Sequence, residues 1–228
     1  MNRLVITMGD PCGVGPEIIV KFFDGIYKVE DKRLFLVVVG SKSVLEYYKK
    51  KLRIDLEIVE ITKAHIVDGK LENGKLHLIN IDTDIDKLEF GKHTELGGAL
   101  SIKYLDKAIE LCHGKYVDGI VTCPISKDSI NMAGFKYSGH TEYLAEKSKT
   151  EDFAMVLKGK KVVVLLNSTH VSLKEAINRV TKESVLNKIR LAQKAKKELG
   201  LTGSIAVAGL NPHNGENGLF GTEEIEII

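Results

Sequence analysis

Apolar runs alternate with helical patterns along most of the chain. A short apolar run at residues 4–8 predicts a strand, and the continuous apolar run at residues 34–39 is typical of a parallel strand that is buried on both faces. Residues 96–112 carry apolar side chains at helical spacing. This alternation predicts an α/β fold with a mostly parallel sheet. Further strands are predicted at residues 56–61, 76–81, 120–122, 153–157, 162–166 and 204–208, and further helices at residues 18–23, 41–51, 143–147, 173–180 and 182–199.

Two features qualify this pattern. The strands predicted at residues 153–157 and 162–166 flank a short lysine-rich turn, which indicates a hairpin and therefore a mixed sheet. A last helix begins at Thr222, and no segment follows it within the chain against which it could pack. We expect either a chain that is truncated at its C-terminus or a frayed tail.

Composition excludes several classes of protein. Of the 228 residues, 43% are hydrophobic and 28% are charged, and the net charge of +2 gives no bulk attraction to nucleic acid. No apolar run approaches the roughly 18 residues that a membrane span requires. Cys12, Cys112 and Cys123 are far apart and form no C-x-x-C pair, so we expect a cytoplasmic protein without disulfides.

Histidines provide the first candidate chemistry. His170 and His213 each follow a predicted strand, and strand ends on one side of a parallel sheet converge. Two neutral imidazoles suit zinc, cobalt or iron, although a metal site needs at least one more ligand and no third histidine is placed to supply it. The alternative, in which both are capping or surface residues, stays open.

A glycine-rich turn and a lysine provide candidate anion sites. Gly13 and Gly15 lie between a predicted strand and a predicted helix, where free N–H groups favour an anion. Ile18 stands where a dinucleotide-binding motif needs a third glycine, so a purely structural tight turn is an equal alternative. Lys127 follows the strand at residues 120–122 and suits either anion binding or proton transfer, unless it is simply a solvated lysine.

Several motifs together resemble one enzyme family. Residues 9–17 read GDPCGVGPE, which resembles the GDPxGxGPE signature of the 4-hydroxythreonine-4-phosphate dehydrogenase family. Four further stretches match the family in the same order along the chain: VTCPISK at 121–127, GHTEYLA at 139–145, STH at 168–170, and LNPH at 210–213 with GE at 215–216 and FG at 220–221.

The resemblance implies a fold and a reaction. The implied fold has two α/β domains with mixed, mostly parallel sheets, similar to the isocitrate and isopropylmalate dehydrogenases. Residues 1–120 would form a first domain that a missing C-terminal segment completes, and residues 121–228 an incomplete second domain that carries metal and substrate residues. The implied enzyme is a homodimer that uses NAD or NADP to oxidise and decarboxylate 4-phosphohydroxy-L-threonine to 3-amino-2-oxopropyl phosphate in pyridoxal phosphate biosynthesis.

The resemblance also implies roles for individual residues. His170 and His213 would hold a divalent metal (zinc, magnesium or cobalt), whose third histidine ligand lies beyond the end of this chain. His140 and Thr141 would contact the small phosphorylated hydroxy-acid substrate. Lys127 is the predicted catalytic residue, and the turn with Gly13 and Gly15 is the predicted cofactor contact.

Three alternatives remain at this point. A related branch of the family acts on phosphorylated sugar acids such as 4-phosphothreonate and 4-phosphoerythronate, and these motifs do not separate the two branches. Similar α/β folds also host transferases that act on phosphorylated or acyl-phosphate substrates, which have no need of paired histidines. A chain that lacks its last segment is alternatively an inactive fragment or a binding module.

Overall fold

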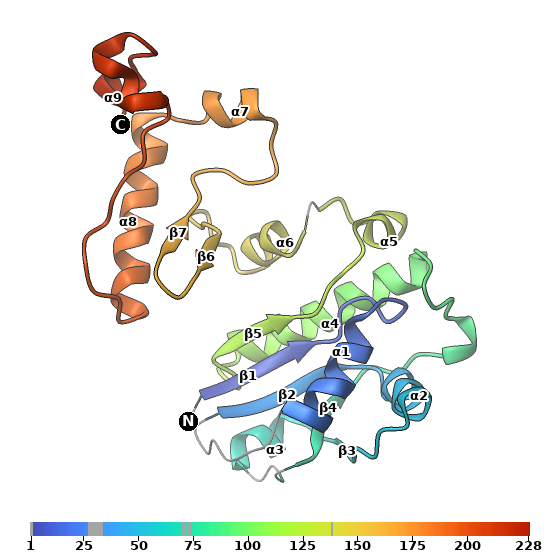
Figure 1. The fold of residues 1–228 in the computed structure, drawn as a ribbon. Helices are drawn as coiled ribbons and strands as arrows, with labels where there is room; N and C mark the ends of the chain where they lie inside the picture. The colour runs from blue at the N-terminus through green and yellow to red at the C-terminus, as the bar shows by residue number, and fades with distance from the viewer. Residues whose placement is uncertain (1, 27–33, 70–71, 73, 138) are drawn as a thin grey trace. The chain divides into compact units, whose positions relative to one another are not determined.

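The chain folds into two compact units, residues Met1–Ser148 and Lys149–Ile228. The computed structural model describes residues 2–26, 34–69, 72, 74–137 and 139–228 (Figure 1). The predicted domain division at residues 120 and 121 concerns a longer chain and stays a prediction. In the structure, residues 121–148 belong to the first unit. Residues 121 and 122 lie in a strand of the first unit's sheet, and the helix that begins at Lys127 packs on the longest helix of that unit.

A five-stranded sheet in the order β3-β4-β2-β1-β5 forms the centre of the first unit (Figure 1). Every strand pair in it is parallel, as the apolar runs predicted. The middle strand, residues 34–40, carries no polar side chain, so both faces of the sheet must be covered there. The strands are β1 (Asn2–Thr7), β2 (Leu34–Gly40), β3 (Ile58–Glu60), β4 (Leu76–Asn80) and β5 (Gly119–Thr122).

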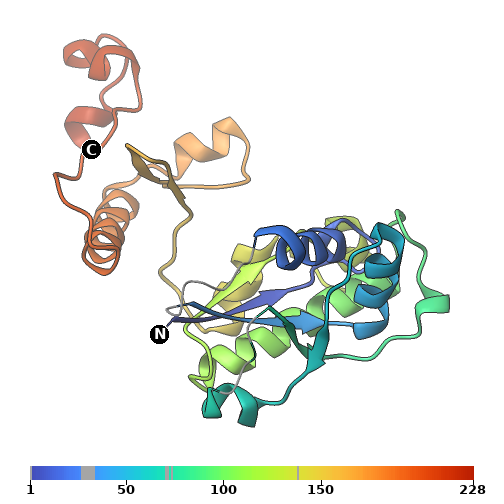
Figure 2. The same ribbon diagram turned by 60° about the horizontal axis from the view of Figure 1, so that its bottom comes forward.

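Helices cover the two faces of this sheet (Figure 2). α1 (Gly15–Lys21) and α2 (Lys42–Leu52) contact each other on one face, and α4 (Glu95–His113) packs against β1, β2 and β5 on the other. The remaining elements of the unit are a π-helix η1 (Phe22–Ile26), α3 (Lys63–Asp68), a 3-10 turn η2 (Ile85–Lys87), α5 (Lys127–Met132) and α6 (His140–Lys147).

α4 is buried on two sides, which makes it the support for the site described below. One side packs on the sheet, and the other packs with Ile130 and Tyr143 in a second apolar cluster. Gly98 lies where α4 meets α5: a Cβ at this position would stand 2.0 Å from the carbonyl oxygen of Ser129. The absent side chain therefore sets how closely the two helices approach.

The second unit has a different character. It contains an antiparallel hairpin of β6 (Val156–Lys158) and β7 (Val163–Leu165), as predicted, but the hairpin is a separate sheet rather than part of a mixed one. Of its residues only Gly215 is buried. The helical elements are α7 (Leu173–Asn178), α8 (Lys182–Glu198), the 3-10 segment η3 (Pro212–Gly218) and α9 (Glu223–Glu226).

The strand predicted at residues 204–208 is wrong. This segment has no strand partner in the structure, and Ile205 and Val207 are exposed. A β-branched run forms a strand only where another strand satisfies its backbone, and in the second unit β6 and β7 pair only with each other. None of the helices in the described part of the chain is long and apolar enough to cross a membrane.

The contact at Gly98 generates a stability prediction. Replacing an interior helix glycine by alanine normally stabilises a helix by about 1 kcal/mol. We expect Gly98→Ala instead to lower the free energy of unfolding by about 2 kcal/mol, because its Cβ collides with Ser129. Urea denaturation measures this. Gly25→Ala, which meets nothing within 4 Å, is the matched control and should change stability by less than about 1 kcal/mol; equal stability of Gly98→Ala and the wild type would contradict the packing.

Candidate functional site

Three segments meet at the carboxyl ends of β1 and β5. Here the connection from β1 leads to α1 on one face of the sheet, and that from β5 leads to α5, which packs on α4. Such a divergence is where open α/β sheets bind ligands. We call the three segments, residues 9–14, 90–94 and 123–129, the loop junction. The Asp10 N–H donates to the Pro124 carbonyl at 3.0 Å, and the Gly91 N–H donates to the Cys12 carbonyl at 2.8 Å.

The carboxylate of Asp10 links all three segments. Asp10 is only 3% exposed. Its Oδ1 accepts from the Cys12 N–H at 2.9 Å, and its Oδ2 accepts from the Ser129 hydroxyl at 3.0 Å. The Ser129 oxygen in turn accepts from the Thr94 N–H at 3.3 Å. Hydrogen bonds to an ionised acceptor are stronger than neutral ones, so this buried charge holds the junction together.

The start of α4 also stabilises this charge. Thr94 is the N-cap of α4, and its side chain accepts from the Gly97 N–H at 3.0 Å. The Asp10 Oδ1 lies only 2.7 Å from the point that a Cβ on Gly97 would occupy. The carboxylate therefore lies against the first turn of a 19-residue helix, where the helix dipole favours negative charge.

Aromatic contacts fix the junction to α2. Phe90 stacks on Tyr47 with ring centroids 4.4 Å apart and meets Tyr48 edge-on at 5.8 Å. The Tyr48 hydroxyl donates to the carbonyl of Gly13 at 3.3 Å. One pair of tyrosines on α2 thus holds both the segment before α4 and the glycine-rich turn.

Packing explains Gly15 but not Gly13, where a Cβ would come no closer than 3.4 Å to another atom. A Cβ at Gly15 would stand 2.0 Å from the carbonyl oxygen of Met8. The Gly13 N–H donates to the Asp10 carbonyl at 3.0 Å, and the Cys12 N–H is already bonded to the Asp10 carboxylate. Two N–H groups that would cradle a phosphate are therefore occupied. Cofactor binding at Gly13 and Gly15 stays a prediction.

The thiols of the junction are not set up for reaction. Burial raises the pKa of Cys12, and it raises the pKa of Cys123 to about 11. A thiol becomes a nucleophile or a metal ligand as the thiolate, so burial keeps both groups inert.

Lys127 lies at the edge of the junction, just past the end of β5, where the sequence placed it. It is the exposed first residue of α5, and Ser126 caps this helix by accepting from the Ser129 N–H at 3.1 Å. The Ser126 hydroxyl also lies 2.8 Å from Nδ1 of His93, whose Nε2 is 3.9 Å from Asp128. The spacing of residues gave no sign that His93 would contact Ser126, which lies 33 positions later and directly before this lysine.

His140 and Thr141 begin α6, which Tyr143 anchors. Tyr143 is 1% exposed, and its hydroxyl donates to Asp106 on α4. His140 is half-buried, and burial lowers the pKa of its imidazole, so the ring is neutral near pH 7. Its Nε2 is buried without a hydrogen-bond partner. Ser138, which directly precedes the GHTEYLA motif, lies outside the described residues.

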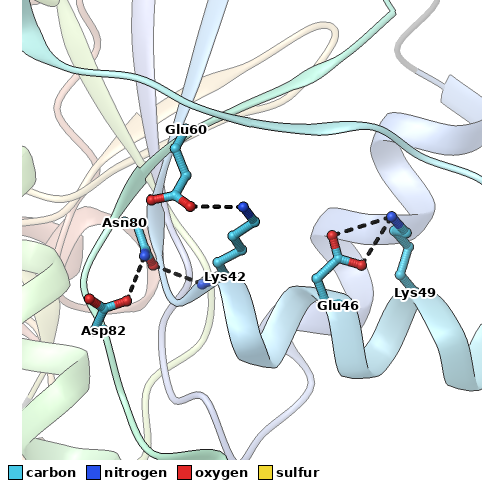
Figure 3. Close-up of polar contacts among 6 residues, drawn as sticks. All are labelled: Lys42, Glu46, Lys49, Glu60, Asn80 and Asp82. Atoms are coloured by element: carbon cyan, nitrogen blue, oxygen red, sulfur yellow. Dashed lines mark hydrogen bonds and ion pairs between the residues drawn. The ribbon is translucent and has the colours of Figure 1, made fainter.

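A second polar cluster lies at the carboxyl ends of β2, β3 and β4 (Figure 3). Lys42 Nζ pairs with Glu60 at 2.8 Å, which lowers the pKa of that carboxyl, and the Lys42 N–H donates to Asn80 at 2.9 Å. Asn80 donates to Asp82 at 2.7 Å, and one turn further along α2 Lys49 pairs with Glu46. Because these groups satisfy one another, the cluster explains how α2 is fixed to the sheet rather than offering a binding site.

The predicted metal ligands both lie in the second unit. His170 and His213 are exposed, with positive φ angles of 55° and 52°. Their expected approach required two parallel strands to end side by side, but one predicted strand is absent and the other lies in an antiparallel hairpin. In the described part of the chain no three His, Cys, Asp or Glu side chains are grouped as a metal site requires. The residues present therefore do not form a complete metal site, and the two ligands stay predictions.

Comparisons with known proteins agree with the motifs. Residues 32–228 match the family model described as pyridoxal phosphate biosynthetic protein PdxA. A curated relative from Fusobacterium nucleatum, named putative D-threonate 4-phosphate dehydrogenase, is 41% identical over 100% of this chain and 68% of its own length. A second, the 4-hydroxythreonine-4-phosphate dehydrogenase of a Sulfurihydrogenibium species, is also 41% identical, over 100% of this chain and 69% of its own.

A solved structure extends the likeness to the fold. The crystal structure of 4-hydroxythreonine-4-phosphate dehydrogenase from Klebsiella pneumoniae matches with a TM-score of 0.88 and 33% sequence identity, covering 99% of this chain and 68% of that one. The family match spans both compact units and includes the motifs after residue 120. This chain belongs to the PdxA family of pyridoxal phosphate biosynthetic proteins.

Proposed function

We propose that this protein is an NAD(P)-dependent dehydrogenase that oxidises and decarboxylates 4-phosphohydroxy-L-threonine to 3-amino-2-oxopropyl phosphate. The observation that carries the proposal is the relative named 4-hydroxythreonine-4-phosphate dehydrogenase, which is 41% identical over the whole of this chain. The relatives' names support an oxidoreductase, and a transferase has no such support.

The proposed reaction balances in two steps. In the first, the secondary alcohol at C3 loses a hydride from carbon and a proton from oxygen, which leaves a ketone. In the second, this β-keto acid releases carbon dioxide and its C2 takes up a proton. The bound nicotinamide supplies the acceptor for the hydride. The protein must bind the anionic substrate, take the alcohol proton and stabilise the enolate.

Residues of the first unit suit these tasks. Lys127 is an exposed cation at the loop junction, so it attracts an anionic substrate and stabilises the enolate by its charge. The neutral imidazole of His140 has an unpartnered Nε2, which suits a hydrogen bond with a substrate group. Thr141 adds a hydroxyl beside it.

Two parts of the proposal rest on the motifs alone. Gly13 and Gly15 remain the proposed cofactor contacts, although the N–H groups of Cys12 and Gly13 are bonded to Asp10. His170 and His213 remain the proposed ligands of zinc, magnesium or cobalt, to which the described residues add no third donor. The steps above therefore use only side chains of the first unit.

A second candidate substrate has equal support from sequence. The relative named putative D-threonate 4-phosphate dehydrogenase is also 41% identical over the whole chain. Its named substrate carries a hydroxyl where 4-phosphohydroxy-L-threonine carries an amino group at C2. The two compounds share the phosphate, the carboxylate and the C3 alcohol, so the same residues suit both.

We further propose a homodimer in the cytoplasm. Large apolar side chains of the second unit are exposed, among them Leu173 at 79%, Leu219 at 73% and Ile225 at 68%. Exposed apolar surface of this kind supports contact with a second subunit. All three cysteines are free, which suits a reducing compartment.

Binding of the two candidate substrates tests the proposal. Calorimetry of the purified chain should show binding of 4-phosphohydroxy-L-threonine, and Lys127→Ala should weaken it by about tenfold because a charged contact is lost. Lys50→Ala, at another exposed lysine, is the control and should leave the affinity unchanged. Formation of reduced nicotinamide is followed in parallel. Binding of neither 4-phosphohydroxy-L-threonine nor D-threonate 4-phosphate would contradict the proposed function.

Metal content tests the histidine pair. Elemental analysis compares the wild type and His213→Ala after purification with zinc, magnesium or cobalt, and the variant should retain less metal because half of the proposed imidazole pair is gone. His113→Ala changes a histidine of the first unit and should keep the metal. The same metal content in His213→Ala as in the wild type would refute the role of His213.

A further inference from the structure

Four buried polar side-chain atoms in the described part of the chain have no hydrogen-bond partner: Tyr104 Oη, His140 Nε2, Glu142 Oε2 and Asn167 Oδ1. Two of the four lie within three residues of one another, in the first turn of α6. A buried polar atom without a partner destabilises the folded state, and most native proteins satisfy such atoms. Each of these two unsatisfied atoms is therefore a candidate contact for another molecule.

The second half of α6 is engaged in contacts within the fold. Tyr143 and Ala145 form its buried face, and the Tyr143 hydroxyl donates to Asp106. Glu146 accepts from the Tyr137 hydroxyl at 2.7 Å. Glu142 instead folds back toward the start of the helix, where its Oε2 lies 3.8 Å from the point that a Cβ on Gly139 would occupy. The unsatisfied carboxylate oxygen is thus a local feature of the segment that carries His140.

The chemistry of the two groups restricts what they can bind. A carboxylate only accepts hydrogen bonds, and a neutral imidazole offers one N–H and one acceptor nitrogen. Burial keeps His140 neutral, so it does not offset the negative charge of Glu142. A phosphate or carboxylate group of a ligand would be repelled by Glu142, whereas a hydroxyl or ammonium group would donate to it.

We propose that Glu142 is a substrate-binding residue that accepts a hydrogen bond from a hydroxyl or ammonium group of the substrate beside His140. The inference rests on the proposed function, since it takes a phosphorylated hydroxy acid as the ligand. Both candidate substrates carry such donors on C2 and C3. The phosphate end of the substrate is accordingly bound away from Glu142.

Glu142→Gln separates this role from a structural one. The substitution keeps the shape of the side chain and removes its charge. Because the carboxylate is unsatisfied in the free protein, the melting temperature of the unliganded variant should equal or exceed that of the wild type. The affinity for 4-phosphohydroxy-L-threonine, measured by calorimetry, should fall by about tenfold, since a charge-assisted hydrogen bond is lost.

Glu146→Gln is the matched control on the same helix. Glu146 already has a partner within the fold, so this variant should keep the affinity of the wild type and melt at a lower temperature. Unchanged affinity in Glu142→Gln, or a lower melting temperature without a change in affinity, would overturn the proposal. If the wild-type chain binds only D-threonate 4-phosphate, 4-phosphohydroxy-L-threonine is refuted as the substrate. The affinities of the two variants for D-threonate 4-phosphate then test the role of Glu142. A wild-type chain that binds neither compound refutes both.

Discussion

The buried carboxylate of Asp10 is the interaction on which the loop junction depends. Its two oxygens accept from Cys12 and Ser129, and Ser129 carries the link on to Thr94 at the start of α4. A buried charge is tolerated only where hydrogen bonds and dipoles compensate it, so each of these donors must stay in place. The position of Lys127, two residues before Ser129, follows from this arrangement.

The two units of the chain differ in how they hold their candidate residues. In the first, α4 packs on the sheet and on α5 and α6, so the segments with Lys127 and His140 are attached to a rigid support. In the second, His170 and His213 are exposed and only Gly215 is buried. Sites on rigid elements are held more precisely than sites on loops, so substrate binding is argued from the first unit.

Much of the first unit could be predicted from sequence because its signals are local. The apolar run of β2 and the helical spacing of α4 are visible in short windows, and both are confirmed. The prediction of a strand at residues 204–208 was wrong because a strand needs a partner strand, and a short window of sequence does not show whether one is available. The expected approach of His170 and His213 depended on that same strand.

The candidate site was predictable only where a motif marked it. Lys127, His140 and Thr141 were found by resemblance. Asp10 lies within the same glycine-rich motif, yet its role depends on Ser129, 119 positions away, and no spacing rule gives such a contact. His93 and Glu142 could not be found from the sequence. The contact of His93 is with Ser126, which is distant in sequence, and only the structure shows that one oxygen of Glu142 has no hydrogen-bond partner.

Amide hydrogen exchange in Asp10→Asn tests the central claim directly. If one carboxylate links the segments, the amides of Cys12 and Thr94 should lose protection together, each exchanging about tenfold faster, because the variant places an NH₂ group against one of the two donors. Asp55→Asn, at an exposed loop residue, should leave both amides unchanged. Faster exchange at Cys12 with Thr94 unaffected would show that Asp10 organises only its own turn.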